Sequence, residues 1–484
     1  MINSGIQDDV PLCVNCDYAL LKTDVLQEAI FLFIKKSPLN IIRLAIWILR
    51  GRSELIQRVS AEVQINWPTV PRMDAVVQRM RAAHADNRPV FLLTSMPEKW
   101  AQEVSAEFQF SKPILVGNVN SGASADDPAT QIANRFGLGG FDYIGEGRRD
   151  LSICKAARNT LIVASDRAAT PADGFNSSAQ SLSVGDRSGP LVILKMIRVH
   201  QWLKNFLILV PLLAAHRLTS VRSIGLAAVA FLAFSFCASS VYVLNDLLDL
   251  ESDRQHVRKR NRPIAAGKVT INQALLVAAT LLAGSAWLAW EVSPLFALTV
   301  GVYFIMTLTY SLRLKRQVIV DVMLLAALYT VRVVAGAVAT LVIPSFWLLA
   351  LSMFLFLSLA VVKRYSEMLV TLAQEKQYAA GRGYRVEDLP VLLSLGVGAG
   401  MAAIVVLALY INDASTIKLY PTTIWLWPVP PLMLYWVSRV WMKAHRGEMH
   451  DDPVVFAMRD WQSLITLVLL GACFAAAATT WPIS

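Results

Sequence analysis

The sequence is constrained above all by a series of long apolar runs, almost free of charged residues, in the part of the chain after residue 206. A helix that crosses a bilayer needs about 20 consecutive apolar residues, and most of these runs reach that length. The 484 residues are 55% hydrophobic and only 17% charged, and their mean hydropathy is +0.48. This composition argues against a purely soluble or a disordered protein. It predicts an α-helical membrane protein with several spans.

We predict nine spans from these runs. A shorter helix at 206–215 comes first, and a span that contains two charged residues lies at 319–341. The other seven are 223–244, 272–290, 292–312, 333–362 (broken by Pro344), 389–412, 419–438 and 461–484.

The loops between the spans differ in positive charge. The loops after the second, fourth, sixth and eighth spans hold 18 Lys and Arg residues in total, whereas the other four hold 3. Because basic loops stay in the cytoplasm, these four loops are expected there, and so is the N-terminal part, which begins without an apolar leader. The interpretation is an integral, multi-pass protein of a bacterial plasma membrane, with its active-site loops on the cytoplasmic side.

The net charge of +10 lies almost wholly in the apolar part, where residues 171–484 carry 26 Lys and Arg against 17 Asp and Glu. This location favours an anionic membrane surface or phosphate-bearing substrates as partners, and it argues against nucleic acid.

Residues 1–168 have a different pattern. Short apolar segments that read as strands (10–14, 89–94, 113–116, 141–144 and 160–164) alternate with helical stretches such as 24–36, 73–84 and 98–108. This order predicts a soluble, doubly wound α/β domain. The apolar run 41–49 is about half a span long, so it is expected to be a cap or a helix that rests on the membrane. Residues 169–189, rich in Ala, Ser, Asp and Gly, are expected to be a linker to the membrane domain at 190–484.

Four oxygen-bearing side chains follow the second span at helical spacing. Asn245, Asp249 and Asp253 recur every four residues, and Asp246 is three residues before Asp249, so a continuous helix would carry all four on one face. Carboxylates gathered this closely repel one another unless a cation neutralises them. Hard oxygen ligands that leave room for phosphate oxygens suit Mg2+, with Mn2+ as a substitute. All four are candidate metal ligands, and Asp246, Asp249 and Asp253 are candidate catalytic residues.

Basic residues come directly afterwards, at 258–260 and at Arg262. A carboxylate-bound metal beside cations such as Lys259 and Arg262 could hold a diphosphate and stabilise it as a leaving group. A topology signal alone would explain the positive charge, but it would not explain the acidic cluster beside it.

These residues resemble the UbiA superfamily of intramembrane transferases, whose first signature is N-D-x-x-D-x-x-x-D followed by R-P-x-x-x-G. The signature is complete at Asn245, Asp246, Asp249, Asp253, Arg262, Pro263 and Gly267. The resemblance covers about residues 190–484. It implies nine helices around a central cavity and binding of a diphosphate through Mg2+.

The aromatic prenyltransferases of that superfamily carry a second aspartate-rich motif on a later loop. Here that loop has Lys363 and Arg364 without paired aspartates. In this the chain looks like the branch of polyprenyl-phosphate (decaprenyl-phosphate) phosphoribosyltransferases, to which the stretches 198–205 and 310–315, and Asp321 with 332–336, are also similar. The residue chemistry agrees with this resemblance, because two cations suit a lipid phosphate better than a second metal does. The resemblance implies substrate binding by Lys204, Asn205, Lys259, Arg262, Tyr310, Lys315, Asp321, Arg332, Lys363 and Arg364.

The expected function is Mg2+-dependent transfer of a phosphoribosyl group from phosphoribosyl diphosphate to a polyprenyl phosphate. The alternative is transfer of a polyprenyl group from its diphosphate to an aromatic acceptor such as a hydroxybenzoate. A non-enzymatic carrier or channel is a third reading, and it is weaker because the acidic residues concentrate on one helix face. Asp321 and Arg332 lie about three turns apart on one predicted span, so either a structural ion pair or a substrate contact would explain them.

The N-terminal domain resembles the haloacid dehalogenase-like phosphatase fold, a Rossmann-type α/β fold whose first strand ends in D-x-D-x-T. Here that strand ends in Asn15-Cys16-Asp17, so an amide stands in place of the nucleophilic aspartate. An amide cannot form an aspartyl-phosphate intermediate. Thr94 or Ser95 is the candidate for the hydroxyl residue that ends the second strand of that fold. We expect a catalytically degenerate domain with a regulatory or docking role, and residual phosphatase activity is the minority reading.

Overall fold

The computed structural model describes residues 10–37, 39–108, 111–115, 127–146, 150–164, 180–183, 189–216, 220–375, 377, 382–449 and 452–479. It divides into two compact units. The first consists of Met1–Ile197 with Val243–Val277, and the second of Arg198–Tyr242 with Ala278–Ser484. The loop that carries the aspartate signature thus belongs to the same unit as the N-terminal domain.

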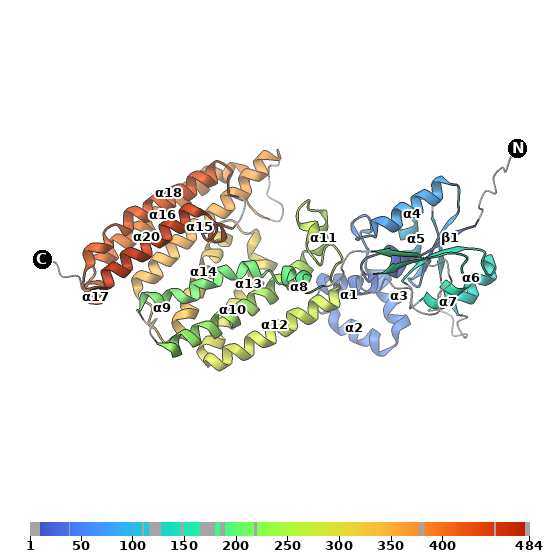
Figure 1. Cartoon of the computed structure of the whole chain (residues 1–484), viewed down its shortest axis with the longest axis horizontal. Coiled ribbons are helices and arrows are strands. Elements are labelled where there is room, and N and C mark those ends of the chain that lie inside the picture. Colours follow the sequence, from blue (N-terminus) through green and yellow to red (C-terminus); the bar gives the residue numbers. More distant parts are fainter. Residues whose placement is uncertain are drawn as a thin grey trace. The chain divides into compact units, whose positions relative to one another are not determined.

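The N-terminal domain contains one parallel sheet of six strands in the order β3-β2-β1-β4-β5-β6. Figure 1 shows this sheet beside the label β1. The strands are β1 (Leu12–Asn15), β2 (Val90–Thr94), β3 (Ser111–Leu115), β4 (Asp142–Gly145), β5 (Thr160–Ala164) and β6 (Gln180–Ser183). Leu12 of β1 pairs with Val90 on one side and Asp142 on the other. The first five strands confirm the predicted alternation of strands and helices.

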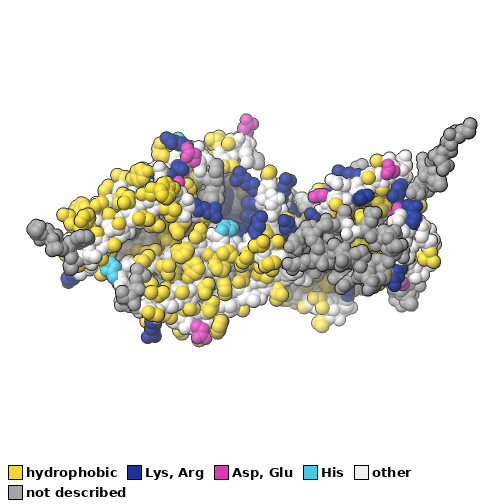
Figure 2. All heavy atoms as spheres, in the orientation of Figure 1, with side chains coloured by type: hydrophobic (Ala, Val, Ile, Leu, Met, Phe, Trp, Pro, Cys, Tyr) yellow, Lys and Arg dark blue, Asp and Glu magenta, His cyan; other side chains and the backbone are white. Residues whose placement is uncertain are grey.

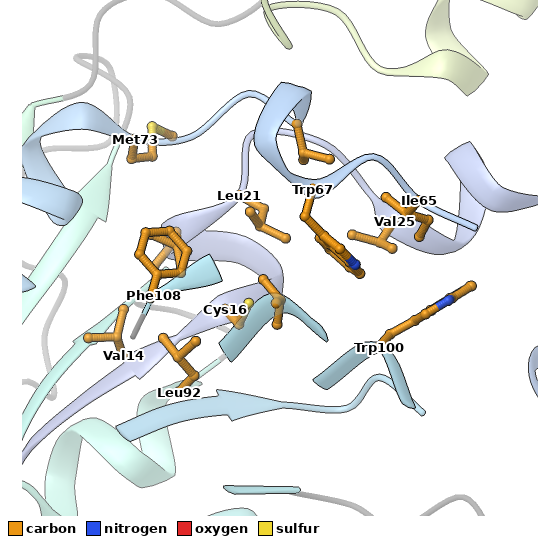
Figure 3. Packing of buried hydrophobic residues seen from close by; sticks show 14 of the residues in the cluster. Val14, Cys16, Leu21, Val25, Ile65, Trp67, Met73, Leu92, Trp100 and Phe108 are labelled. Carbon is orange, nitrogen blue, oxygen red and sulfur yellow. The ribbon is translucent and has the colours of Figure 1, made fainter. Parts of the chain in front are cut away.

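Helices cover both faces of this sheet, because alternate strand residues point to opposite sides. Leu12 and Val14 face one core, whereas Cys13 faces the other. The first core packs against α1 (Val25–Lys36), α2 (Asn40–Leu49), α3 (Arg52–Glu62), α4 (Asp74–Ala85) and α5 (Glu98–Glu107). The second core packs against α6 (Pro128–Phe136) and α7 (Leu151–Ala156). Figure 3 shows the first core, in which Val14 and Leu92 approach Cys16 and Phe108.

The segment expected to be a linker contains a strand. Residues Gln180–Ser183 form β6, which pairs in parallel with β5 along the edge of the sheet. The sequence did not predict this strand, because it is rich in Ser and lacks an apolar pattern. An edge strand can form its backbone hydrogen bonds without such a pattern. The rest of the expected linker, apart from Gly189, lies outside the described residues, and so does residue 116 of the third predicted strand.

Seven helices among the described residues are long and apolar enough to cross a membrane. They are α10 (Val221–Leu248), α12 (Ile271–Val292), α13 (Pro294–Leu312), α14 (Val320–Ala339), α15 (Phe346–Ala373), α16 (Leu389–Ile411) and α20 (Trp461–Ala478). Hydrophobic side chains cover much of the visible surface of these helices, as expected for contact with lipid (Figure 2).

Two of the nine predicted spans do not meet these criteria. Residues 206–214 belong to two short elements, the 3-10 helix η4 (Val199–Leu209) and the α-helix α9 (Val210–Ala214). α9 is little more than one turn long, and Pro211 is its second residue. α18 (Val429–His445) has 17 residues and carries basic side chains in its last turn. A count of nine spans therefore stays a prediction.

α10 and α14 are the most buried of the long helices, whereas few residues of α12, α13 and α20 are fully buried. Gly336 explains one close contact of α14, because a Cβ atom there would lie 1.9 Å from the carbonyl oxygen of Ile208 in η4. The backbones of α14 and η4 therefore approach each other directly, which places the polar side chains of both elements together.

Candidate functional site

The aspartate signature spans a break in the helix. α10 ends at Leu248 and α11 comprises Leu250–Gln255, so Asp249 lies between two helices rather than within one. The amide of Asp249 nevertheless donates to the carbonyl of Asn245 at 2.9 Å, and the amide of Asp253 donates to that of Asp249 at 2.8 Å. These bonds preserve the four-residue spacing across the break. The expectation of one continuous helix is thus corrected, although its helical spacing holds.

Arg262 bridges two of the aspartates. Its Nη1 donates to Oδ1 of Asp246 at 3.1 Å and to Oδ2 of Asp253. Both carboxylates are almost fully buried, whereas Arg262 is partly exposed. Lys259, in η5 (Lys259–Asn261), is exposed to solvent. The loop therefore holds a cation between two carboxylates and presents further cations at its surface, which is suitable for an anionic ligand.

The donor set of this loop fits a hard cation. Asn245 Oδ1 is buried and has no hydrogen-bond partner among the described residues, so it remains available as a ligand. Together with Asp246, Asp249 and Asp253 it offers the oxygen ligands that Mg2+ uses. In the described part of the chain, no three carboxylate, His or Cys side chains are already close enough to enclose a metal ion.

A second polar cluster forms in the other unit around Asp452, which directly precedes α19 (Pro453–Ala457). The carboxylate accepts a hydrogen bond from Lys204 Nζ at 2.7 Å and from Lys363 Nζ at 3.2 Å. The hydroxyl of Tyr329 donates to both oxygens at 2.9 and 3.0 Å. Although burial raises the pKa of Asp452, the ammonium groups of Lys204 and Lys363 lower it more, and the net pKa lies well below its usual range. The carboxylate is therefore ionised at every physiological pH.

Arg332 extends this cluster into the centre of the helices. Its Nε donates to Oδ1 of Asn205 at 2.9 Å, its Nη2 donates to the hydroxyl of Tyr303 at 2.8 Å, and its Nη1 donates to the carbonyl of Leu328. The guanidinium also lies over the ring of Tyr329, 5.6 Å from its centroid. Neutral groups thus solvate Arg332 without cancelling its charge.

We call the side chains of Lys204, Arg332, Lys363 and Asp452 the cationic cluster. Among the described residues, Asp452 is the one carboxylate that pairs with its lysines, so three cations face one anion. Lys204, Arg332 and Asp452 have side chains that are nearly buried. Uncompensated buried charge is unfavourable, so an excess of positive charge here favours an anionic ligand.

Asp321 and Arg364 belong to a separate, balanced cluster. Arg364 Nη2 lies 2.6 Å from Asp321 Oδ2, and both side chains are completely buried. The hydroxyl of Tyr384 donates to Asp321 Oδ1 at 2.6 Å, and Arg364 also pairs with Glu367. Asp321 therefore pairs with Arg364. The ion pair of Asp321 with Arg332, one of the two alternatives left open for these residues, is not formed between them. These partners compensate the charge of Arg364, and its role in substrate binding stays a prediction.

Tyr310 and Lys315 lie beside the same balanced cluster. Arg382 Nη1 donates to the hydroxyl of Tyr310 at 2.9 Å and to the carbonyl of Lys315 at 3.4 Å. Arg382 Nε also lies 3.9 Å from Oε2 of Glu367. Of the ten predicted substrate-binding residues, the structure thus brings four into or against the cationic cluster. These four are Lys204, Asn205, Arg332 and Lys363.

The N-terminal domain has polar residues at the carboxyl ends of β1, β2 and β4, where the strand order changes direction. Asn15 Nδ2 donates to Asp150 Oδ2 at 3.0 Å. The carboxylate of Asp17 accepts from Thr94 Oγ1 at 2.6 Å and from Ser95 Oγ at 2.7 Å. These groups satisfy one another. Both the haloacid dehalogenase-like assignment and the loss of catalysis remain predictions.

Asp452 is the site residue that sequence reasoning missed. Its partners lie 248 and 89 residues earlier in the chain, and no periodic pattern connects them. The one available signal was an Asp-Asp-Pro sequence at 451–453 in a predicted cytoplasmic loop. Such a sequence is also an ordinary helix start, and Asp452 does cap α19 by accepting from the amide of Val454.

The chain is similar to known membrane transferases. The profile described as the UbiA prenyltransferase family matches residues 206–464, more than half of the chain. An uncharacterized protein, y4nM, from Sinorhizobium fredii is 31% identical over 483 residues, which cover 96% of this chain and 90% of y4nM.

A decaprenyl-phosphate phosphoribosyltransferase from Mycobacterium tuberculosis is 41% identical over 180 residues. These residues cover 36% of this chain and 60% of that enzyme, so the chain spans about three fifths of its length. The structure of a UbiA homolog from Archaeoglobus fulgidus bound to GPP and Mg2+ aligns with a TM-score of 0.46 at 17% identity, and it covers 60% of this chain and 100% of that one.

Proposed function

The chain belongs to the UbiA prenyltransferase family and is a membrane transferase of that superfamily, and we propose that it transfers a phosphoribosyl group from phosphoribosyl diphosphate to a polyprenyl phosphate. The similarity to decaprenyl-phosphate phosphoribosyltransferases supports this choice of substrates over the part of the chain that they share. The structural observation that most supports the proposed transfer is the cationic cluster, in which three cations face one carboxylate.

The two polar clusters would receive different anions. The aspartate loop, with Asn245, Asp246, Asp249 and Asp253, would bind the diphosphate of the donor through a divalent cation. That cation, when bound, supplies positive charge to the leaving diphosphate. The partly exposed guanidinium of Arg262 would add a direct contact to a diphosphate oxygen.

The cationic cluster would bind the phosphate of the lipid acceptor. Lys204 and Lys363 offer point charges that need no metal, and Arg332 adds a rigid guanidinium behind them. In the reaction, a phosphate oxygen of the lipid attacks C1 of the ribose, the bond from C1 to the diphosphate oxygen breaks, and diphosphate leaves with the bonding electrons. No general base is required, because the attacking oxygen is already ionised at neutral pH.

The test uses purified full-length protein in lipid vesicles with Mg2+. One reaction contains labelled phosphoribosyl diphosphate and polyprenyl phosphate, and the other contains labelled prenyl diphosphate and hydroxybenzoate. We expect a labelled lipid product in the first reaction and none in the second. A prenylated aromatic product, with no phosphoribosyl lipid, would contradict the proposal and favour aromatic prenyl transfer.

A further inference from the structure

The N-terminal domain holds the aspartate loop through a buried ion pair. Arg254 of α11 donates from Nη1 and Nη2 to the two carboxylate oxygens of Glu28 in α1, at 2.5 and 3.0 Å. Only 4% of the Arg254 side chain and 7% of the Glu28 side chain are exposed. A two-pronged pair with this geometry fixes orientation as well as distance. Arg254 is adjacent to Asp253, so the pair acts directly beside the signature.

Further contacts hold the segment on both sides of the helix break. Lys35 Nζ, also in α1, donates to the carbonyl of Leu248, the last residue of α10. A lysine at this position is favourable because the end of a helix has unpaired carbonyls and a partial negative charge. Asn66 Nδ2 donates to Glu251 Oε1 at 3.1 Å.

The end of the signature also contacts the N-terminal domain. Gly267 has a φ of +68°, and a Cβ atom there would lie 2.7 Å from the Cβ atom of Lys22. A glycine is therefore required both by the backbone conformation and by the close contact.

α11 needs such support because it is short. It has six residues, and a helix of this length is not stable alone in water. Asp253 and Arg254 are successive residues, so their side chains leave the helix in directions that differ by about 100°. Asp253 turns to Arg262, whereas Arg254 turns to Glu28. The face of α11 that carries Asp253 thus contributes to the aspartate signature, and the face that carries Arg254 is held by the N-terminal domain.

We propose that the N-terminal domain positions the aspartate loop for metal–diphosphate binding, with Glu28 and Arg254 as positioning residues. The domain is then a structural part of the transferase. The proposal rests on the proposed function only in taking the loop as the site of a divalent cation and a diphosphate. It does not depend on which group is transferred.

The test compares the full-length protein with its Glu28→Gln variant. Mn2+ binding is measured from the free-ion electron paramagnetic resonance signal, with inorganic pyrophosphate present, and hydrogen exchange is measured in the peptide 249–262. We expect Glu28→Gln to weaken Mn2+–pyrophosphate binding roughly tenfold, as is typical when a group that orients metal ligands is lost. Exchange in the peptide should become faster, while peptides of β1 and β2 remain protected.

Two further variants make the result specific. Glu62→Gln removes a solvent-exposed ion pair with Arg43 in the same domain and should change neither measurement. Exchanging the charges with Glu28→Arg and Arg254→Glu should restore most of the binding. Asn66→Ala is a milder change that leaves the ion pair intact, and it should also accelerate exchange in the peptide.

Unchanged binding and exchange in both Glu28→Gln and Asn66→Ala would overturn the proposal, and so would equal effects of Glu62→Gln. Failure of phosphoribosyl transfer, together with the expected loss of Mn2+–pyrophosphate binding in Glu28→Gln, would contradict the proposed function and leave the positioning role standing.

Discussion

Asp452 is the residue on which the cationic cluster depends, because its carboxylate accepts from both lysines and from Tyr329. We predict that Asp452→Asn lowers the free energy of unfolding by about 3 kcal/mol, since it leaves the nearly buried Lys204 without a counter-charge. A short prenyl monophosphate should recover a large part of this loss, because its phosphate would replace the missing carboxylate. Thermal unfolding in detergent, with and without the monophosphate, measures both effects.

Asp460→Asn is the matched control for this prediction. Asp460 pairs with Arg439 at 2.6 and 2.9 Å and is similarly buried, but it lies outside the cationic cluster. The variant should be destabilised and should gain no more from the monophosphate than the native protein does. Equal recovery in both variants would show that the ligand does not bind at Asp452.

Lys363 and Arg364 are neighbours in sequence with different predicted roles. Lys363→Ala should raise the KM for polyprenyl phosphate roughly tenfold to a hundredfold, the effect of losing a charge-assisted contact worth about 1.5 to 3 kcal/mol. Arg364→Ala should instead destabilise the protein by about 3 to 5 kcal/mol, because it leaves the buried Asp321 unpaired. Steady-state kinetics and thermal unfolding of both variants separate the two effects. A stable Arg364→Ala protein with a raised KM would contradict the structural role of Arg364.

At the residue scale, the sequence predicts contacts that are local and misses those that are distant. Asn245, Asp249 and Asp253 are connected by regular spacing, so their proximity could be inferred. The pairing of Asp321 with Arg364 joins two helices, whereas spacing along the sequence could offer only Arg332, on the same helix, as one possible partner beside a substrate contact. Spacing along one helix says which residues share a face, but not what the neighbouring helix presents to that face.

At the element scale, most helices and strands agree with the expected ranges, because each has a strong apolar pattern. The exceptions are elements that tertiary contacts maintain. β6 depends on pairing with β5, and the separation of α11 from α10 accompanies contacts of the N-terminal domain with Leu248 and Arg254. Neither effect appears in a local pattern of residues.

α2 exposes an apolar surface that suits a lipid bilayer. Ile41, Ile42, Ile48 and Leu49 are between 54% and 88% exposed, and Arg43 on the same helix is also exposed. A short helix with an apolar face and cationic neighbours lies in the interface of an anionic membrane. We predict that a polarity-sensitive fluorophore attached at Ile46→Cys, in a Cys473→Ala background, shifts its emission to the blue in phosphatidylglycerol vesicles.

Gln78→Cys on α4 is the control for α2, because this position is also exposed but lies on a polar helix surface. A fluorophore at this position should keep the emission typical of an aqueous environment in the same vesicles. If both positions give the same emission, or if position 46 shows no quenching by spin-labelled lipids, α2 does not rest on the membrane.

At the scale of the whole molecule, composition and loop charge predict a multi-pass membrane protein, and the alternation of strands and helices predicts a soluble domain. The aspartate motif and its resemblance predict a transferase, which the family match confirms. Composition could not reveal that the buried charges separate into a balanced cluster and an unbalanced one. Arg364 and Arg382 lie against Asp321 and Glu367, so their charges cancel. The excess remains in the cationic cluster, where Lys204, Arg332 and Lys363 face Asp452. This separation suggests that the two sites bind different anions.

The separation of the two sites predicts that binding of the two substrates responds differently to removal of the metal. With excess chelator, binding of phosphoribosyl diphosphate should weaken at least a hundredfold, on the order expected when a multivalent charge contact is lost. Binding of polyprenyl phosphate should change less than about threefold, because the cationic cluster uses lysine and arginine alone. Asp249→Asn should reproduce the effect of the chelator on the donor. Equilibrium binding of each labelled substrate to the protein in vesicles measures both.

Lys363→Ala provides the opposite pattern, with weakened acceptor binding and intact donor binding. Both variants, Asp249→Asn and Lys363→Ala, are needed because general unfolding would weaken the binding of both substrates together. If the lipid were itself the diphosphate donor, the chelator would release the prenyl diphosphate, and Asp249→Asn and Lys363→Ala would impair the same substrate. Full transfer activity in excess chelator would contradict the metal site altogether, since the buried carboxylates of Asp246 and Asp253 would then have Arg262 as their principal counter-charge.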